Sequence, residues 1–238
     1  MIREFFDDYK SYSPANTQQE IYFIMQVLNL PAAARILDLY CGYGRHAIQL
    51  AKNGFRVTGV DPTQAFLDIA RQKAREEMAE LEFQQYDMRC LDFHQKFDAV
   101  INMFATFGYF SDEENLNVLK LIAQSLQSKG VLLMDLLNRD WMVRNNLNRY
   151  WRHPGGDYVV SYKVELQNGV AVMKREITNQ NTGVKTKYEF FLRSYSLPEL
   201  DLIMQASGFH IVNAYGNFDN EPYSPDSPRM IVLAEKTV

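Results

Sequence analysis

The sequence predicts an α/β protein with a doubly wound, mostly parallel sheet, plus a small inserted antiparallel β-sheet. Two observations predict this fold. From about residue 35 to 137, short apolar runs alternate with stretches that carry apolar residues at helical spacing, which is the pattern of parallel strands joined by helices. From about 157 to 195, the pattern changes to strand-like runs separated by turn signals. Because helix and strand signals resume afterwards, we expect one domain that carries an insertion.

Composition bounds the class of protein. The chain has 238 residues, a net charge of −4, 47% apolar residues and 23% charged residues, as in ordinary soluble proteins. No basic block stands out, which argues against nucleic acid as a partner. Cys41 and Cys90 lack metal-ligand spacing, so we expect no metal. The acidic N-terminus has no apolar signal segment and no stretch could span a bilayer, so we expect a cytoplasmic protein with no membrane partner. The sequence carries no signal for an oligomeric state.

The first 30 residues are expected to be helical. Pro14 separates an aromatic and acidic stretch from a second segment. In that segment, Thr17 and Glu20 have the spacing of a capping box at the start of a helix. Apolar residues at helical spacing follow and stop near Pro31. We therefore expect a helix to precede the first strand.

The alternating region predicts five strands with helices between them. Strands are expected at about 35–40, 56–60, 82–86, 97–103 and 131–137, and helices at about 44–53, from 62 onward, and at about 111–128. Gly54 should end the first of these helices, and Pro62 should lie in the first turn of the second. Ser111 and Glu114 should cap the third, and Gly130 should end it.

The inserted sheet is expected at 150–195. Its strand-like runs cover 157–167, 170–178 and 185–195. Asn168-Gly169 is a strong hairpin signal and Asn181-Thr-Gly183 is a second turn. A helix is then expected at 197–207, followed by the two last strands at 210–215 and 230–235.

The stretch 35–51 is the strongest candidate for a ligand site. An apolar strand containing Asp38 leads into Gly42-Tyr-Gly44 and a helix start, where glycine allows close approach and backbone N–H groups are unpaired. The spacing of the glycines and of Asp61 formally matches a dinucleotide fingerprint. However, two like charges about 4 Å apart repel by about 4 kcal/mol at an effective dielectric of about 20, so Asp38 disfavours a phosphate. It suits a ligand with a cationic end, unless it only caps the glycine turn.

Four stretches resemble the motifs of class I S-adenosylmethionine-dependent methyltransferases. They are Asp38-Leu-Tyr-Cys-Gly-Tyr-Gly44, Val57-Thr-Gly-Val-Asp61, Phe83-Gln-Gln-Tyr-Asp-Met-Arg89 and the strand and loop at 97–110. The resemblance implies S-adenosyl-L-methionine as the cofactor and a Rossmann-like core at 31–140 and 196–238, whose sheet has an antiparallel last strand. It also implies that residues 1–30 form a helical lid and that 150–195 forms a wall on the acceptor side, for which aromatic and polar residues such as Tyr188 and Arg193 are suited.

The resemblance also implies roles for individual residues. Asp61 would accept hydrogen bonds from the ribose diol, Asp87 would accept the adenine amino group, and the Met88 N–H would meet a ring nitrogen. The backbone carbonyls of Met103 and Phe104 would accept the methionine ammonium. The full set of expected cofactor-binding residues is Asp38, Gly42, Tyr43, Gly44, Asp61, Pro62, Asp87, Met88, Met103, Phe104 and, in the lid, Tyr12.

The expected activity is in-line methyl transfer to N or O of a small-molecule acceptor. No residue type or spacing demands a particular catalytic group; Tyr109 and His153 are the candidates, with Asp135 at the end of the fifth strand as a further one. Phe107 fits either the core or the pocket. The alternatives are an RNA or protein methyltransferase, a nicotinamide-dependent oxidoreductase and a non-catalytic cofactor-binding module. Arginines near the fifth strand, such as Arg139 and Arg144, are the candidates for a basic groove.

Overall fold

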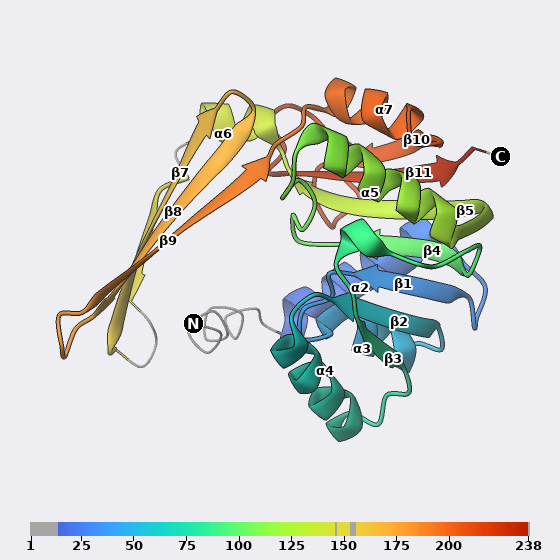
Figure 1. Ribbon diagram of the computed structural model, residues 1–238, viewed down its shortest axis with the longest axis horizontal. Coiled ribbons are helices and arrows are strands. Elements are labelled where there is room, and N and C mark those ends of the chain that lie inside the picture. Colours follow the sequence, from blue (N-terminus) through green and yellow to red (C-terminus); the bar gives the residue numbers. More distant parts are fainter. Residues whose placement is uncertain (1–13, 146, 153–155, 238) are drawn as a thin grey trace.

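The computed structural model describes residues 14–145, 147–152 and 156–237. Within these residues the strands form a seven-stranded sheet and a separate four-stranded sheet, as Figure 1 shows. The fold class predicted from the sequence is therefore confirmed. Tyr12 and His153 lie outside the described residues, as does the whole segment ahead of Pro14. Among the described helices, none has the length and apolar character needed to cross a membrane.

The large sheet has the order β10-β11-β5-β4-β1-β2-β3. Its strands are β1 (Arg35–Leu39), β2 (Arg56–Asp61), β3 (Glu82–Gln85), β4 (Phe97–Asn102), β5 (Leu126–Leu137), β10 (Phe209–Tyr215) and β11 (Arg229–Lys236). β11 runs antiparallel to both of its neighbours, whereas the other pairs are parallel. The chain reverses its direction of winding between β1 and β4, and ligands of such sheets bind outside the carboxyl ends of the strands at that point.

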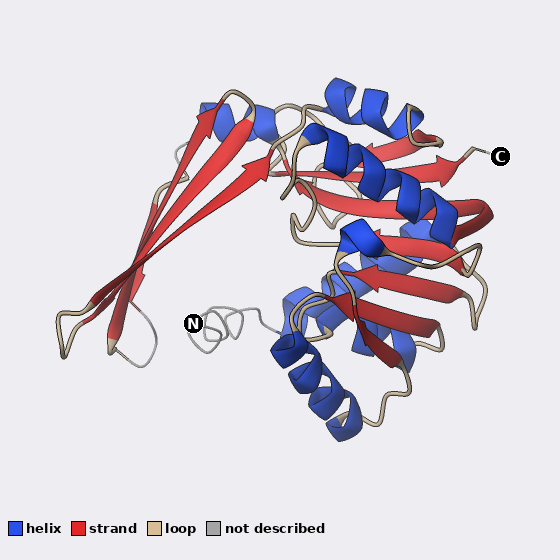
Figure 2. Cartoon of the chain, in the orientation of Figure 1, coloured by secondary structure: helices blue, strands red, loops and turns tan. Residues whose placement is uncertain are grey.

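Helices cover both faces of the large sheet (Figure 2). They are α2 (Pro14–Leu28), α3 (Arg45–Lys52), α4 (Gln64–Glu76), α5 (Asp112–Ser125), α6 (Arg139–Arg144) and α7 (Leu197–Gln205), with a short 3₁₀ turn, η1, at Met88–Cys90. One buried cluster joins α2 and α3 to one face of the sheet, for example through Phe23, Ile24 and Leu50. A second joins α5 and α7 to the other face, for example through Ile122 and Met204. The sheet is thus a central layer that holds the strand ends in place.

Two expected helix boundaries are wrong. The helix that was expected to start at Thr17 already begins at Pro14. Thr17 and Glu20 therefore lie within α2, where their side chains bond Arg45 and His46 of α3. Gly130 does not end α5, because Ser125 does so earlier by bonding the Ile122 carbonyl at 2.7 Å. Gly130 lies inside β5, next to an irregularity in the pairing with β4. The Ser111–Glu114 capping box of α5 is confirmed.

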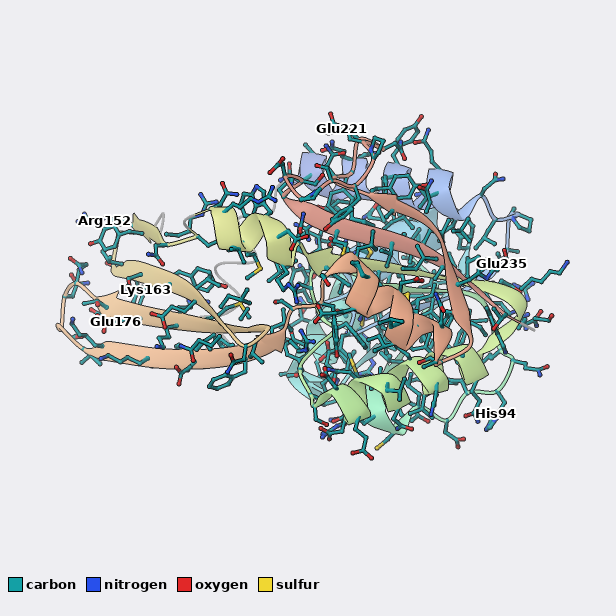
Figure 3. All side chains as sticks on the ribbon, turned by 90° about the horizontal axis from the view of Figure 1, so that it is seen from above. His94, Arg152, Lys163, Glu176, Glu221 and Glu235 are labelled. Carbon is teal, nitrogen blue, oxygen red and sulfur yellow. The ribbon has the colours of Figure 1, made fainter. Side chains whose placement is uncertain are left out.

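The inserted sheet has the order β6-β7-β8-β9. Its strands are β6 (Arg149–Arg152), β7 (Tyr158–Gln167), β8 (Val170–Asn179) and β9 (Lys185–Arg193). Both predicted hairpin turns are confirmed, with Asn168 and Gly169 in left-handed conformation. The sequence did not predict α6 or β6. The sheet projects away from the core (Figures 1 and 3).

The base of the inserted sheet is fixed to the carboxyl ends of β4 and β5. Leu192 and Ala171 pack in one cluster with α6, Leu137 and Ala105. The Arg193 N–H donates to the Gly108 carbonyl at 2.7 Å, and its guanidinium bonds Asp112 of α5 and Glu199 of α7. Arg193 was expected to form part of the acceptor wall, but these contacts make it an anchor between sheet and core.

The two faces of the inserted sheet differ. Side chains alternate between faces along a strand, so the paired residues Tyr162, Arg175 and Tyr188 share a face with Leu192. This face, which continues the cluster at Ala105, we call the aromatic face; Tyr188 and Phe190 stack on it with ring centroids 6.4 Å apart. The opposite, polar face carries lysines and glutamates, including Lys163 and Glu176 far out on the sheet (Figure 3).

Candidate active site

A cavity of about 220 Å³ lies at the carboxyl ends of β1, β2 and β4. Eight residues expected to be near the cofactor or acceptor line it: Asp38, Gly42, Tyr43, Asp61, Pro62, Met103, Phe104 and Tyr109. Gly44 is the N-cap of α3 beside it. The strand order brings these residues together from three separate stretches of sequence.

The glycine turn shapes the floor of the cavity. Gly42 and Gly44 both have positive φ, at 56° and 75°, a backbone region in which a side chain is disfavoured. A Cβ at Gly44 would also lie 2.8 Å from the Phe83 ring. The turn lets the chain pass directly from β1 into α3 while its N–H groups face the strand ends.

Asp61 lies at the end of β2 and is already hydrogen-bonded to this turn. Its Oδ2 accepts from the Gly42 N–H at 3.0 Å, and its Oδ1 accepts from the Thr63 N–H at 2.8 Å. The residue is 5% exposed, and burial raises its pKa above the ordinary value. Each carboxylate oxygen has two lone pairs, so Asp61 can accept further donors from the cavity.

Asp38 is buried, and its Oδ2 has no hydrogen-bond partner within the described part of the chain. Burial raises the pKa of the Asp38 carboxyl to about 7, although the Ala47 backbone hydrogen bond and the Arg45 charge act in the opposite direction. A buried carboxylate without a partner is destabilising. The atom therefore fits a cationic or hydrogen-bond-donating ligand group, and this donor set suits the ammonium and sulfonium of S-adenosylmethionine.

Phe104 follows β4 in an uncommon conformation. Phe104 and Ala105 have φ of 62° and 55°, and a non-glycine residue held there costs of order 1–3 kcal/mol. The Phe104 N–H donates to Asp135 Oδ2 at 2.9 Å. The hydroxyl of Thr106, another lining residue, donates to the Met103 carbonyl at 3.0 Å. The loop 103–106 is thus held by specific hydrogen bonds while it forms one wall of the cavity.

The sequence reasoning missed several lining residues, notably Tyr40, Arg45, Thr63, Phe66 and Thr106. Tyr40 stacks on Tyr109 with centroids 6.2 Å apart. Arg45 is bonded to Thr17 and Glu20 of α2. Proximity to the glycine motif could have indicated Tyr40 and Arg45, whereas the contacts with α2 have no signal in the sequence.

His46 of α3 also lines the cavity. It is 7% exposed and its Nε2 lies 2.9 Å from Glu20 Oε2. Burial lowers the pKa of His46, against the raising effect of the Glu20 hydrogen bond. His46 and Arg45 therefore connect the cavity to α2.

Three expected site residues lie elsewhere. The Asp87 carboxylate is bonded to Arg89 and lies outside the lining of the cavity. Met88 is fully buried, and its backbone is hydrogen-bonded to Tyr40. Phe107 is 2% exposed and packs against Tyr195. Of the two positions that the sequence allowed, core or pocket, Phe107 therefore occupies the core.

Comparison with known proteins identifies the kind of site. Residues 36–130, which span β1 to the turn within β5, match the family model described as a methyltransferase domain. Over this stretch the chain is similar to methyltransferase domains. The chain also resembles a putative methyltransferase of Geobacillus sp. (strain WCH70), with 29% identity over 86% of this chain and 85% of the relative. It also resembles a glycine/sarcosine N-methyltransferase of Halorhodospira halochloris, with 28% identity over 90% of this chain and 80% of the relative.

The fold of the chain has close counterparts among solved structures. An S-adenosylmethionine-dependent methyltransferase from Clostridium acetobutylicum aligns with a TM-score of 0.83 over 100% of this chain and 99% of that chain, at 17% identity. The alignment covers the inserted sheet as well as the core. Both sheets therefore belong to one recurring architecture.

Proposed function

We propose that the protein transfers the methyl group of S-adenosylmethionine, bound in the cavity at Asp38 and Asp61, to a small-molecule acceptor. The observation that carries the proposal is the buried Asp38 Oδ2, which has no hydrogen-bond partner among the described residues and belongs to a side chain that lines the same cavity as Asp61. The acceptor atom would be N or O. Nitrogen is favoured because the relative from Halorhodospira halochloris is named a glycine/sarcosine N-methyltransferase.

The residues present support a division of roles within the cavity. Asp61 would accept the ribose hydroxyls, and hydrogen bonds to a charged group are worth about 1.5–3 kcal/mol each. Asp38 and the Met103 carbonyl would accept the ammonium. Arg45, at the first turn of α3, would face the carboxylate. Asp87 and Met88 would reach the adenine only if the Tyr40 contact with Met88 gave way, so their assignment remains a sequence-based prediction.

The acceptor would bind between the cavity and the aromatic face of the inserted sheet. Tyr109 lines the cavity and is 43% exposed, so it lies at the rim. Ala105 connects the loop 103–106 to the cluster at the base of the inserted sheet. This continuity supports the role of 150–195 as an acceptor wall.

The chemistry asks little of the protein beyond positioning. The cofactor supplies a sulfonium-activated methyl group, and orienting two reactants can contribute roughly 7–11 kcal/mol of barrier reduction. An amine that arrives neutral needs no general base. Asp135 is not suited to that role because both of its oxygens bond Arg229 or Phe104. Tyr109 remains the proposed catalytic candidate among the described residues.

A methyl-transfer screen tests the proposal. Purified protein with S-adenosylmethionine would be given glycine, sarcosine, an amino sugar, a catechol, a mixed peptide pool and transfer RNA, and release of S-adenosylhomocysteine would be measured. Turnover with an amine of low molecular mass is expected. Turnover confined to the peptide pool or the RNA would contradict the proposal and favour the protein or RNA alternative.

A further inference from the structure

The C-terminal strand β11 supplies Arg229, which forms an ion pair with Asp135 next to Phe104, a residue that lines the cavity. Asp135 of β5 is fully buried, and Arg229 is the first residue of β11. Arg229 Nε donates to Asp135 Oδ1 at 2.6 Å, and its Nη2 donates to Oδ2. A planar guanidinium that meets a carboxylate in this forked manner fixes its orientation. β11 lies about 90 residues after β5 in sequence, well outside the motifs that build the cavity.

The same aspartate holds the cavity loop through the backbone. Asp135 Oδ2 accepts the Phe104 N–H at 2.9 Å, and the Asp135 carbonyl accepts the Ala105 N–H at 2.8 Å. Phe104 and Ala105 are the residues of the loop 103–106 that have left-handed backbone conformation. An uncommon conformation persists only when the surroundings specify it, and here the specifying contacts come from one residue.

Arg229 also holds the side chain of the same loop. Its guanidinium lies 4.9 Å from the centroid of the Phe104 ring and 5.2 Å from that of Phe218. Phe218 stacks on Phe104 at an interplanar angle of 17°, and Arg45 lies 4.5 Å from the Phe104 centroid. Arg229 thus contacts the ring of Phe104 while its partner Asp135 binds the backbone of Phe104.

We infer that Asp135 and Arg229 are positioning residues for the cofactor: they hold Phe104 and Ala105 in the left-handed conformation, so that the loop 103–106 forms a cofactor-binding wall. This inference rests on the proposed placement of S-adenosylmethionine in the cavity. Without the pair, the loop relaxes to an ordinary backbone conformation and the wall is lost. The fold remains, because the strands on either side are held by their own ladders.

A merely structural ion pair would produce a different pattern, and a matched control exists. Arg35 and Asp98 form a second forked pair at the amino ends of the central strands β1 and β4, with the Arg35 Nη2 3.1 Å from Asp98 Oδ1. Glycine adopts positive φ without strain. In an Ala105→Gly variant, residue 105 should therefore keep its positive φ with less dependence on the Asp135–Arg229 pair.

The experiment measures the dissociation constant of S-adenosylhomocysteine by calorimetry, with thermal unfolding in parallel. Asp135→Asn and Arg229→Lys are expected to weaken binding at least about fivefold, whereas Asp98→Asn should lower the unfolding temperature with little effect on binding. In the Ala105→Gly background, Asp135→Asn should weaken binding by a clearly smaller factor than in the wild type. Arg229→Lys keeps the positive charge, so its dissociation constant for S-adenosylhomocysteine tests the inference if Asp135→Asn does not fold.

Three outcomes would overturn the inference: undiminished binding by Asp135→Asn and Arg229→Lys, equal weakening by Asp98→Asn, or the same factor in both backgrounds. The Asp61→Ala variant shows whether a negative result contradicts the positioning role or the proposed cofactor site. If Asp61→Ala also binds like the wild type, the cofactor is not in this cavity. If Asp61→Ala alone loses binding, the site is right and the positioning role is wrong.

Discussion

Charged side chains are buried in the cavity of the large sheet, whereas on the polar face of the inserted sheet they lie within reach of solvent and are paired. In the cavity, Asp38 and Asp61 are buried, and one Asp38 oxygen has no partner among the described residues. On the polar face, Lys174 pairs with Glu165 and Lys185 pairs with Glu176, all in reach of solvent. Exposed pairs contribute about 0–1 kcal/mol, whereas a buried carboxylate without a partner is costly. The difference indicates which charges serve a ligand and which serve solubility.

The largest expected effect is at Asp61. Asp61→Ala should raise the dissociation constant of S-adenosylhomocysteine about 10- to 100-fold, because two hydrogen bonds to a charged group are lost. Calorimetry measures this. Asp68→Ala is the control, since Asp68 is an exposed acid of α4 bonded to Gln64 and Arg71. Equal affinity in the wild type and a folded Asp61→Ala variant would mean that the cofactor does not bind in this cavity.

Asp38→Asn should separate binding from stability. The folded-state pKa of Asp38, about 7, lies above the ordinary value of 3.8. The carboxyl therefore gives up its proton less readily in the folded state, and the cofactor-free protein loses stability as pH rises from about 4 to about 7. At pH 8, Asp38→Asn should raise the free energy of unfolding by about 1–3 kcal/mol and weaken S-adenosylmethionine binding about tenfold.

The pH dependence sharpens this prediction. Wild-type affinity for S-adenosylmethionine should increase between about pH 6 and pH 8 as Asp38 ionises, and the increase should be much smaller in the Asp38→Asn variant. Denaturant titrations and calorimetry across this range measure both quantities. A variant that is less stable than the wild type at pH 8 would mean that Asp38 is a structural cap of the glycine turn.

A smaller and more selective effect is expected on the aromatic face. Tyr188→Ala should reduce acceptor turnover several-fold and leave S-adenosylhomocysteine affinity within about twofold. Phe191→Ala is the matched control, because Phe191 lies on the polar face of the same strand and is 55% exposed. Loss of cofactor affinity in Tyr188→Ala, or identical turnover in both variants, would mean that the inserted sheet is not the acceptor wall.

The smallest effect is expected on the polar face itself. Glu165→Gln removes one partner of Lys174 and should change the free energy of unfolding by less than about 1 kcal/mol, with no change in binding. Thermal unfolding at low and high salt is the measurement. A large loss of stability would show that the two regions differ less than their exposure indicates.

Much of the fold could be predicted from the sequence because local patterns are strong there. Apolar runs, glycines such as Gly54 and the Asn168-Gly169 turn specify strands, helix ends and a hairpin without reference to distant residues. Asp38, Asp61 and Met103 were placed correctly at strand ends because strand order brings such ends together. The spacing of apolar residues and the conformations of turn residues depend on neighbours in sequence, so they can be predicted without knowledge of distant contacts.

The rest could not be predicted because it depends on contacts between distant segments. Glu20 fits a capping box in sequence but is used by Arg45 and His46 of α3. Arg193 fits an acceptor wall but anchors the sheet to Asp112 and Glu199. The bond between Asp87 and Arg89 competes with the role that its motif indicates. In each case a charged side chain had a nearer partner than the sequence pattern suggested.

The central claim is that S-adenosylmethionine binds at the carboxyl ends of β1, β2 and β4. A crystal structure of the protein with S-adenosylhomocysteine tests it most directly. The account predicts the ribose hydroxyls within hydrogen-bond distance of Asp61, the ammonium beside Asp38 and the Met103 carbonyl, and the sulfur open toward the aromatic face. The claim would be contradicted by a ligand bound in the larger hollow at the amino ends of the strands, lined by Arg35, Arg56 and Glu82, with no ligand contact to Asp38 or Asp61.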